Sequence, residues 1–393
     1  MPARPDLPPA LRTLVDVGLG LVRRAPSARI AIVRAGDLLD PAVLAPELRE
    51  AVEEEVAAAR AAVCEEIPRR EVERLLRDAW GRPPKDVLDE LDPEPLAVRP
   101  AAQVHAGTVD GRRVAIKVRR DGVERAVRND VALLETLSGP LRSAFPNLEA
   151  GAILRDLREA ALDELDFEHE ASQQRRVARA LRGVPGIEVP RPHLELCEGG
   201  VLVSDLLDGT TLADGARPAD AEGAARTLVA AFRATALDAG LAPVDPRPTH
   251  VLVRGDGSLG LLGAGVARPV DRERAALALD ALAALADDDA TAFATVVAGA
   301  GLLPEDAARD AHPALRDVLG DFLAGPTTLD APALVAFNER AAAATQQLAS
   351  LAMAAAPRPQ DLALARMLGQ LVAVLARLGA TLDWVGLARA EPS

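Results

Sequence analysis

Apolar residues recur at helical spacing through the first part of the chain. Leu44, Leu48, Val52 and Val56 follow one another four residues apart, with acidic residues and arginines between them. This spacing is typical of a helix with one buried face. Prolines interrupt the stretch at several points, and a proline within a helical pattern ends or kinks the helix. Residues 1–91 therefore predict an N-terminal extension of several short helices.

Alternation replaces the helical spacing after Leu96. The runs Gln103–Thr108 and Arg113–Val118 alternate in the manner of strands and flank Asp110-Gly111. An Asp-Gly dipeptide suits a tight hairpin turn, because its glycine tolerates a positive φ. Two paired strands are therefore expected here.

The centre of the chain returns to helical spacing before one further strand. Helices are expected over 122–137 and 152–181, and an apolar run over 200–208 predicts a strand that ends at Gly209. A helix follows over 220–240, and a proline-rich loop then continues to residue 250.

Two short strands precede a long helical C-terminal region. Val251–Arg254 and Leu259–Leu262 bracket Gly255-Asp256-Gly257, which has the composition of a turn. Everything over 272–387 has helical spacing with proline breaks.

This order of elements predicts a two-lobed, protein-kinase-like α+β fold that is rich in helix. The 393 residues exceed the usual length of one domain. We expect three regions: the helical extension 1–91, a small mixed lobe with inserted helices over 92–208, and a helical C-lobe over 209–393.

Charge and composition narrow the functional classes. The formal net charge of −14 disfavours a nucleic-acid partner, which would need a basic surface. No run of residues is long and apolar enough for a membrane span, and the start of the chain lacks the pattern of a signal peptide. Cys64 and Cys197 are far apart in sequence, which suits a reducing cytoplasm rather than a disulfide framework. We expect a cytoplasmic protein, soluble or attached to a membrane surface.

Lysine is scarce in this chain, and that makes Lys117 a candidate functional residue. Of the 45 basic residues only Lys85 and Lys117 are lysines. Lys117 ends the sequence Val114-Ala-Ile-Lys117, which has the form of the kinase strand whose lysine contacts phosphate. A compact ammonium is not interchangeable with a guanidinium fork. The alternative interpretation is a solvated lysine on an edge strand.

Several motifs together resemble those of the UbiB/AarF family of atypical kinases. They include Asp92-Pro-Glu-Pro-Leu-Ala97, the lysine strand, and Asp163-Glu-Leu-Asp-Phe-Glu-His-Glu-Ala171. The resemblance covers nearly the whole chain and implies the kinase-like fold. In the family an E-x-D pair and a later glutamate lie on an inserted helix. By resemblance, Glu164 and Asp166 form the E-x-D pair, and Glu170 pairs with Lys117. An acidic, solvated helix remains the other interpretation.

Two glycine- or alanine-rich motifs of the family are altered in this chain. The family's K-x-G-Q sequence, on a helix over the nucleotide cleft, appears as Arg34-Ala-Gly36-Asp37. Its alanine-rich phosphate loop appears with Pro100, which has no N–H to offer a phosphate. The resemblance still places Ala101, Ala102 and Gln103 in nucleotide binding.

The catalytic loop departs furthest from the family pattern. The family's D-P-H-P-G-N is Asp245-Pro-Arg-Pro-Thr-His250, so the acid that accepts the substrate proton is kept and the metal-binding asparagine is replaced. The family's L-L-D-F-G is Leu261-Leu-Gly263-Ala-Gly265, so the metal-binding aspartate is lost. Mg²⁺ prefers oxygen ligands, and neither imidazole nor glycine supplies one. The resemblance therefore implies ATP as a ligand, bound without firmly held Mg²⁺, with Glu164 and Asp166 as candidate replacement ligands.

The function implied is that of a nucleotide-binding pseudokinase with a regulatory or scaffolding role. The family links this role to isoprenoid quinone or membrane-lipid metabolism, with a lipid, an isoprenoid or a membrane surface as a further partner. Two alternatives stay open: an active ATPase or small-molecule kinase with an unusual metal site, and an interaction module that binds no nucleotide. His105 has no second ligand at metal-binding spacing, so a structural role is expected for it.

Overall fold

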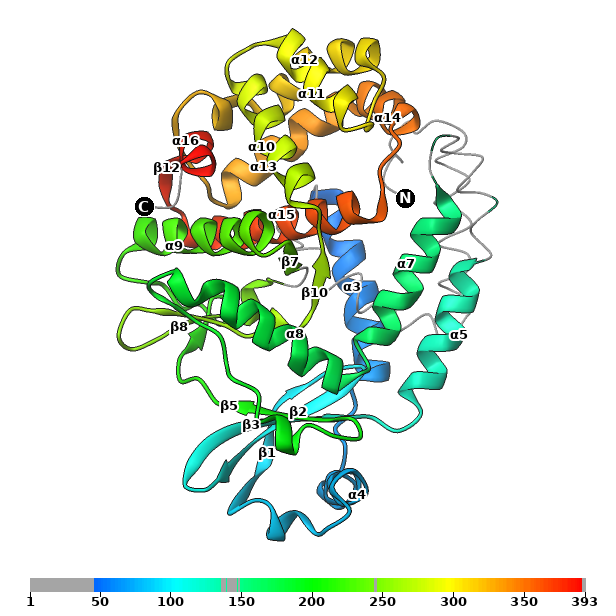
Figure 1. Ribbon diagram of the computed structural model, residues 1–393, viewed down its shortest axis with the longest axis vertical. Coiled ribbons are helices and arrows are strands. Elements are labelled where there is room, and N and C mark those ends of the chain that lie inside the picture. Colours follow the sequence, from blue (N-terminus) through cyan, green and yellow to red (C-terminus); the bar gives the residue numbers. More distant parts are fainter. Residues whose placement is uncertain (1–45, 136–138, 140–146, 148, 244–245, 391–393) are drawn as a thin grey trace.

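The computed structural model describes residues 46–135, 139, 147, 149–243 and 246–390, and its ribbon has two lobes (Figure 1). The small lobe holds a four-stranded antiparallel sheet in the order β1-β2-β3-β5. Its strands are β1 (Glu90–Val98), β2 (Ala102–Val109), β3 (Arg112–Arg119) and β5 (Val201–Asp205).

The predicted hairpin joins β2 to β3. Asp110 and Gly111 both have positive φ, at 48° and 72°, as a two-residue hairpin turn requires. The register pairs Val104 with Lys117 and continues without a shift along both strands. The sequence-based expectation for these two strands is confirmed.

Strand β1 was not predicted, and its sequence explains why. It contains Pro93 and Pro95, and its pairing with β2 has register shifts on either side of Pro95. Prolines cannot donate to a ladder, so they are tolerated only on an edge strand such as this one. The regional boundary expected at residue 91 falls inside β1.

The N-terminal helices α3 (Pro46–Val63) and α4 (Arg69–Trp80) precede the sheet. Val72 and Leu76 of α4 are fully buried against Val114 and Ile116 of β3. Helix α4 is therefore part of the small lobe, on the face of the sheet opposite to the C-lobe.

The segment expected as one helix over 152–181 is two helices. Helix α7 (Ala150–Asp163) ends before residues 164–166, and α8 (Phe167–Ala180) begins after them. Helix α7 pairs with α5 (Val123–Glu135), and α8 runs between the sheet and the C-lobe (Figure 1). The resemblance implies that the E-x-D pair and Glu170 lie on one inserted helix, and this is wrong for Asp166, which precedes α8.

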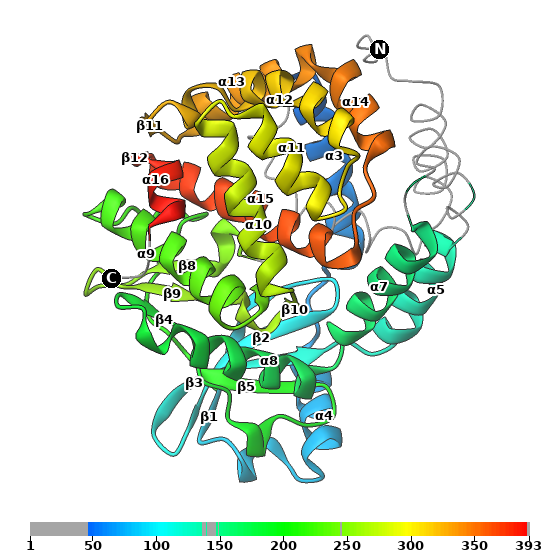
Figure 2. The same cartoon turned by 45° about the horizontal axis from the view of Figure 1, so that its top comes forward.

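The C-lobe is mainly helical around one large core. Its core contains fully buried residues of α9 (Ala221–Arg233) and α15 (Pro359–Leu378), including Leu228 and Val374. Helices α10 (Arg272–Ala286), α11 (Ala290–Gly299) and α12 (Glu305–Leu319) lie side by side beyond it (Figure 2). The remaining C-terminal helices are α13 (Ala331–Ala343), α14 (Thr345–Ala354) and α16 (Trp384–Arg389).

Short strands in the C-lobe form one further sheet and two separate strand pairs. A second sheet has the order β4-β9-β8-β6, and two further pairs are β7 with β10 and β11 with β12. The bounds are β4 Ile187–Glu188, β6 Thr210–Thr211, β7 Leu241–Pro243, β8 Val251–Val253, β9 Leu259–Leu261, β10 Ala267–Pro269, β11 Pro326–Thr328 and β12 Thr381–Asp383. The antiparallel pairing of β8 with β9 confirms the expected strands at 251–262. The pairing of β11 with β12 corrects the expectation of helices only beyond residue 272.

No helix in the described part of the chain is long and apolar enough to cross a membrane.

Candidate functional site

Strand β3 sorts its side chains between two environments. Val114, Ile116 and Val118 are completely buried on the α4 side. Successive strand residues point to opposite faces, so Lys117 and Arg119 face α8. The same alternation that predicted the strand therefore places the Lys117 side chain on the face next to α8, between the lobes.

Lys117 and Glu170 form the ion pair that the sequence predicts. The Lys117 ammonium donates to both carboxylate oxygens of Glu170, at 2.8 Å and 2.6 Å. The side chains are 27% and 13% exposed, so the pair is half-buried. The ammonium also lies 4.4 Å from the centre of the Phe167 ring, which attracts a cation through its negative face. A strand of the small lobe is thus joined to α8 by two hydrogen bonds and a ring contact.

Two further interactions hold the first turn of α8 in place. The Asp166 carboxylate accepts hydrogen bonds from the backbone N–H groups of Glu168 and His169, at 3.1 Å and 3.0 Å, and so caps the helix. Arg119 donates to the carbonyl of Leu165 at 2.6 Å. Asp166 therefore acts here as a helix cap, and its expected role towards a nucleotide stays a prediction.

Gly265 allows close contact between α8 and the loop that follows β9. This loop forms a single turn, η7 (Gly263–Gly265). A Cβ atom added to Gly265 would lie 2.4 Å from Cγ of Glu170 and 3.1 Å from its carbonyl oxygen. Both distances are shorter than an ordinary carbon contact, so a larger residue would displace Glu170. The last glycine of the Leu-Leu-Gly-Ala-Gly sequence is thus coupled sterically to the ion pair.

The residues at the family's metal-ligand positions do not fit Mg²⁺. Gly263 has no side chain to offer. The imidazole of His250, which ends the turn η6 (Pro248–His250), has its Nε2 atom 3.4 Å from the Arg247 guanidinium, and a neighbouring cation disfavours a metal ion. Within the described ranges, no group of three or more His, Cys, Asp or Glu side chains could hold a metal. Asp245 and the Arg34-Ala-Gly36-Asp37 sequence lie outside the described residues.

The side chain of Gln103 joins two segments of the small lobe. Its amide oxygen accepts from the N–H of Ile67 at 2.7 Å, and its amide nitrogen donates to the carbonyl of Ile67 at 3.2 Å. The same nitrogen lies 2.8 Å from Nε2 of His105. Gln103 is fully buried and Ala102 nearly so, while Ala101 is half-buried. The structural use of the Gln103 amide leaves nucleotide binding through residues 101–103 as a prediction that rests on the resemblance.

His105 has the structural role that the sequence predicts. Its ring is 2% exposed, and its Nδ1 atom lies 3.2 Å from the carbonyl oxygen of Asp92. Nδ1 donates to that carbonyl, so Nε2 is left to accept from Gln103. Burial lowers the pKa of His105 below its ordinary value, which keeps this ring neutral in the arrangement that both hydrogen bonds need.

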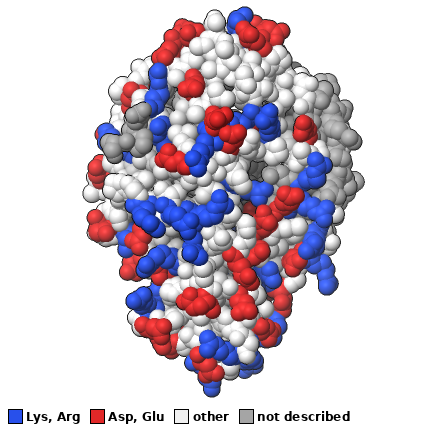
Figure 3. Space-filling view, viewed as in Figure 1, with Lys and Arg blue, Asp and Glu red and all other residues white. Residues whose placement is uncertain are grey.

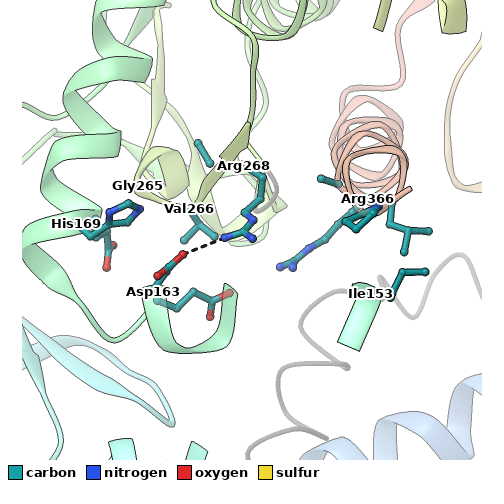
Figure 4. Close-up of a pocket in the computed structure, with 13 residues that line it drawn as sticks. Ile153, Asp163, His169, Gly265, Val266, Arg268 and Arg366 are labelled. Carbon is teal, nitrogen blue, oxygen red and sulfur yellow. Dashed lines mark hydrogen bonds and ion pairs between the residues drawn. The ribbon is translucent and has the colours of Figure 1, made fainter. Parts of the chain in front are cut away.

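Glu164 lies in a pocket of about 140 Å³ beside the ion pair (Figure 4). The wall includes Asp163 and Glu170 as well as arginines that sequence reasoning did not single out. Arg268 of β10 donates to Asp163 at 3.1 Å, and Arg366 of α15 extends into the pocket from the opposite side (Figure 4). Neither arginine belongs to a recognisable motif, and about 100 residues separate them in sequence, so only the fold could reveal their proximity.

A lysine on the third strand, paired with a glutamate on the helix between two lobes, defines a protein-kinase-like fold. Residues 61–297 match the model of the ABC1 atypical kinase-like domain, and the chain belongs to this family. This confirms the expected UbiB/AarF relationship and fold class.

Named relatives agree with this assignment. AarF domain-containing protein kinase 1 of Gallus gallus is 28% identical over 191 residues, which are 47% of this chain and 37% of the relative. The probable protein kinase UbiB of Marinobacter nauticus is 29% identical over 151 residues, which are 37% of this chain and 28% of the relative. The matched regions thus span about a third of these relatives' length.

A solved structure has the same fold. The complex of Rv3197 with erythromycin from Mycobacterium tuberculosis superposes with a TM-score of 0.65 and 19% identity, over 97% of both chains. At this identity the similarity concerns the fold alone.

Proposed function

We propose that this protein binds ATP between its lobes and acts as a pseudokinase, in a regulatory or scaffolding role. The observation that carries the proposal is a contrast within one site. The Lys117–Glu170 pair is intact at 2.6–2.8 Å, whereas Gly263 and His250 stand where the family has its metal ligands. The chain keeps the group that contacts phosphate and has lost the groups that hold the ion.

Phosphoryl transfer explains why this contrast separates binding from catalysis. Its catalysis consists mostly of positioning and of neutralising charge on the phosphoryl oxygens, which the protein-held Mg²⁺ performs. The Lys117 ammonium, kept in place by Glu170, supplies one fixed positive charge for a phosphate. Without the two protein ligands, the protein does not hold the Mg²⁺ ion that would supply the second positive charge. Nucleotide is then held with little dependence on divalent cations, and turnover is very slow.

The decisive measurement is ATP affinity with and without Mg²⁺ or Mn²⁺, using a fluorescent ATP analogue. Lys117→Arg should weaken binding, because a guanidinium fork does not replace a compact ammonium. Lys85→Arg is the matched control, since Lys85 is the other lysine of the chain and is exposed. If both variants bind ATP as well as the unmodified protein, Lys117 is not part of a nucleotide site.

Restoring the lost ligands tests the second half of the proposal. Gly263→Asp together with His250→Asn should make nucleotide binding depend on the metal ion. Each single change should do much less, because both groups serve one ion and their effects are not additive. Rapid, metal-dependent ATP hydrolysis by the unmodified protein, abolished by Asp245→Ala, would refute the proposal. It would favour an active ATPase or small-molecule kinase that uses Glu164 or Asp166 as a replacement ligand.

The proposed setting is isoprenoid quinone or membrane-lipid metabolism, and family membership is its only support. It predicts that an isoprenoid quinone, or vesicles that contain it, raises the thermal unfolding midpoint of the protein. A matched polar quinone without the isoprenoid tail is the control. Equal effects of both quinones, or of neither, would remove this part of the proposal.

A further inference from the structure

The outer face of α8 carries a row of arginines. Arg175, Arg176 and Arg179 belong to α8, and Arg182 belongs to the 3-10 turn η3 (Leu181–Gly183) that follows it. All four are exposed, and their spacing of three or four residues places them on one side of these two elements. Val177 and Leu181, between them, are buried in the C-lobe core. Basic side chains gather in a band over α8 on this face of the molecule (Figure 3).

This row lacks the acidic neighbours that many exposed helical arginines of this chain have. No Asp or Glu stands three or four residues from Arg175, Arg179 or Arg182. Within the described residues, none of the three forms a salt bridge. Other helices pair such arginines with an acid one turn away, as in Arg69–Glu73, Arg74–Asp78, Arg128–Glu124, Arg226–Glu222 and Arg309–Glu305.

Helix stability alone does not account for the row. A cation in the last turn interacts favourably with the helix dipole, but this effect falls off within one turn. It applies to Arg179, whereas Arg175 and Arg176 lie further from the end at Ala180. Arginines one turn apart repel each other, so the free protein carries an unfavourable charge arrangement that an anionic occupant would relieve.

We propose that Arg175, Arg179 and Arg182 form a docking site for an acidic peptide segment of a partner protein. The distance along α8 and η3 from Arg175 to Arg182 is about 11–12 Å, at about 1.5 Å per residue in the α-helix and about 2 Å in the 3-10 turn. An extended peptide rises about 3.3 Å per residue, so a run of three or four acidic residues matches the row. Guanidinium groups bind carboxylates with two parallel hydrogen bonds, and α8 together with η3 presents three such groups.

The charge distribution favours a peptide over a lipid surface. Acidic side chains lie beside the basic band and below it on the same face (Figure 3), and the chain has a net charge of −14. A flat anionic membrane would meet these acidic borders together with the band, whereas a narrow peptide would contact the band alone.

The test uses a fluorescein-labelled hexaglutamate peptide and fluorescence anisotropy. Arg175→Gln, Arg179→Gln and Arg182→Gln together should weaken binding about tenfold, which is about 1.4 kcal/mol. The matched control is Arg69→Gln, Arg128→Gln and Arg309→Gln, which removes three exposed helical arginines and the same net charge. The control should bind almost as well as the unmodified protein, and 0.5 M NaCl should weaken binding to the unmodified protein through screening.

Two results would overturn the proposal. One is equal loss of binding in both triple variants, because the effect would then come from net charge rather than from the α8 row. The other is binding to vesicles of phosphatidylglycerol and phosphatidylcholine that depends on the α8 row, with no binding of hexaglutamate. That outcome would identify the band as a membrane-facing surface.

Discussion

The half-buried ion pair between Lys117 and Glu170 should stabilise the small lobe measurably, and a double-mutant cycle can isolate its contribution. The variants are Lys117→Met, Glu170→Gln and the two combined. Exposed ion pairs contribute up to about 1 kcal/mol, whereas breaking a buried pair costs about 3–5 kcal/mol. With exposures of 27% and 13% and two hydrogen bonds, a coupling energy of about 2 kcal/mol is expected.

The two single variants should differ in cost. Lys117→Met leaves the more buried group, the Glu170 carboxylate, without its partner. Glu170→Gln leaves an ammonium that is more exposed and still lies over the Phe167 ring. Because an unpaired charge costs more where water is less accessible, Lys117→Met should lower the free energy of unfolding more than Glu170→Gln.

Urea denaturation followed by tryptophan fluorescence provides the assay. Trp80 of α4 reports on the small lobe, since its indole N–H donates to the carbonyl of Leu196 at 3.0 Å. A Trp384→Phe background removes the only other tryptophan.

The control cycle uses Arg113 and Asp92, which also form two hydrogen bonds, at 2.9 Å and 2.6 Å, but with side chains 47% and 30% exposed. Its coupling should be clearly smaller and should fall further in 1 M NaCl. Equal coupling in the two cycles would refute the argument that burial makes the Lys117–Glu170 pair important.

Three further predictions concern Gly265, Gln103 and His105. Gly265→Ala should destabilise the protein by about 1–3 kcal/mol, because the new Cβ meets Glu170. The control Gly369→Ala, in open space within α15, should be neutral or stabilising. Equal effects of the two substitutions would contradict the steric argument. Gln103→Leu should lower the free energy of unfolding by about 3 kcal/mol, because it leaves the buried N–H and carbonyl of Ile67 unpaired. Gln174→Leu breaks only one hydrogen bond, to Pro190, and a smaller loss for Gln103→Leu than for Gln174→Leu would contradict this argument. Burial lowers the folded-state pKa of His105, so the unfolded chain takes up the proton first and stability should fall as the pH drops below about 6.5. His105→Gln should flatten this decline in urea titrations between pH 7 and 5, and an unchanged slope would show that His105 is not responsible.

Local patterns predicted the parts of the site that depend on one strand or one motif. The alternation around Lys117 indicated a strand with a functional face, and the Asp110-Gly111 turn indicated its partner. The glutamate partner followed from the family motif, and the ion pair is present in the structure. Its role in binding a nucleotide remains a prediction.

The break between α7 and α8 had a signal that the helical periodicity obscured. Asp166 precedes Phe167 and is followed by Glu168 and Glu170, and an aspartate before a first turn with acidic residues marks a helix start. The strands β11 and β12 have three residues each, too few for alternation to be recognised. The approach of Arg268 and Arg366 depends on the tertiary fold, so no local pattern could predict it.

Both proposed functions, nucleotide binding and peptide docking, depend on helix α8. Its first turn is capped by Asp166 and holds Glu170 against Lys117, and Gly265 contacts it at the same level. Its outer face carries the arginine row from Arg175 onwards.

Because a helix moves largely as one body, an occupant of the row and a nucleotide near Lys117 would each act on the position of α8. Coupling between two sites is reciprocal, so an acidic peptide that shifts α8 would alter ATP affinity by the same factor by which ATP alters peptide affinity. Equal peptide affinities with and without saturating ATP would show that the two sites are independent, even if each exists.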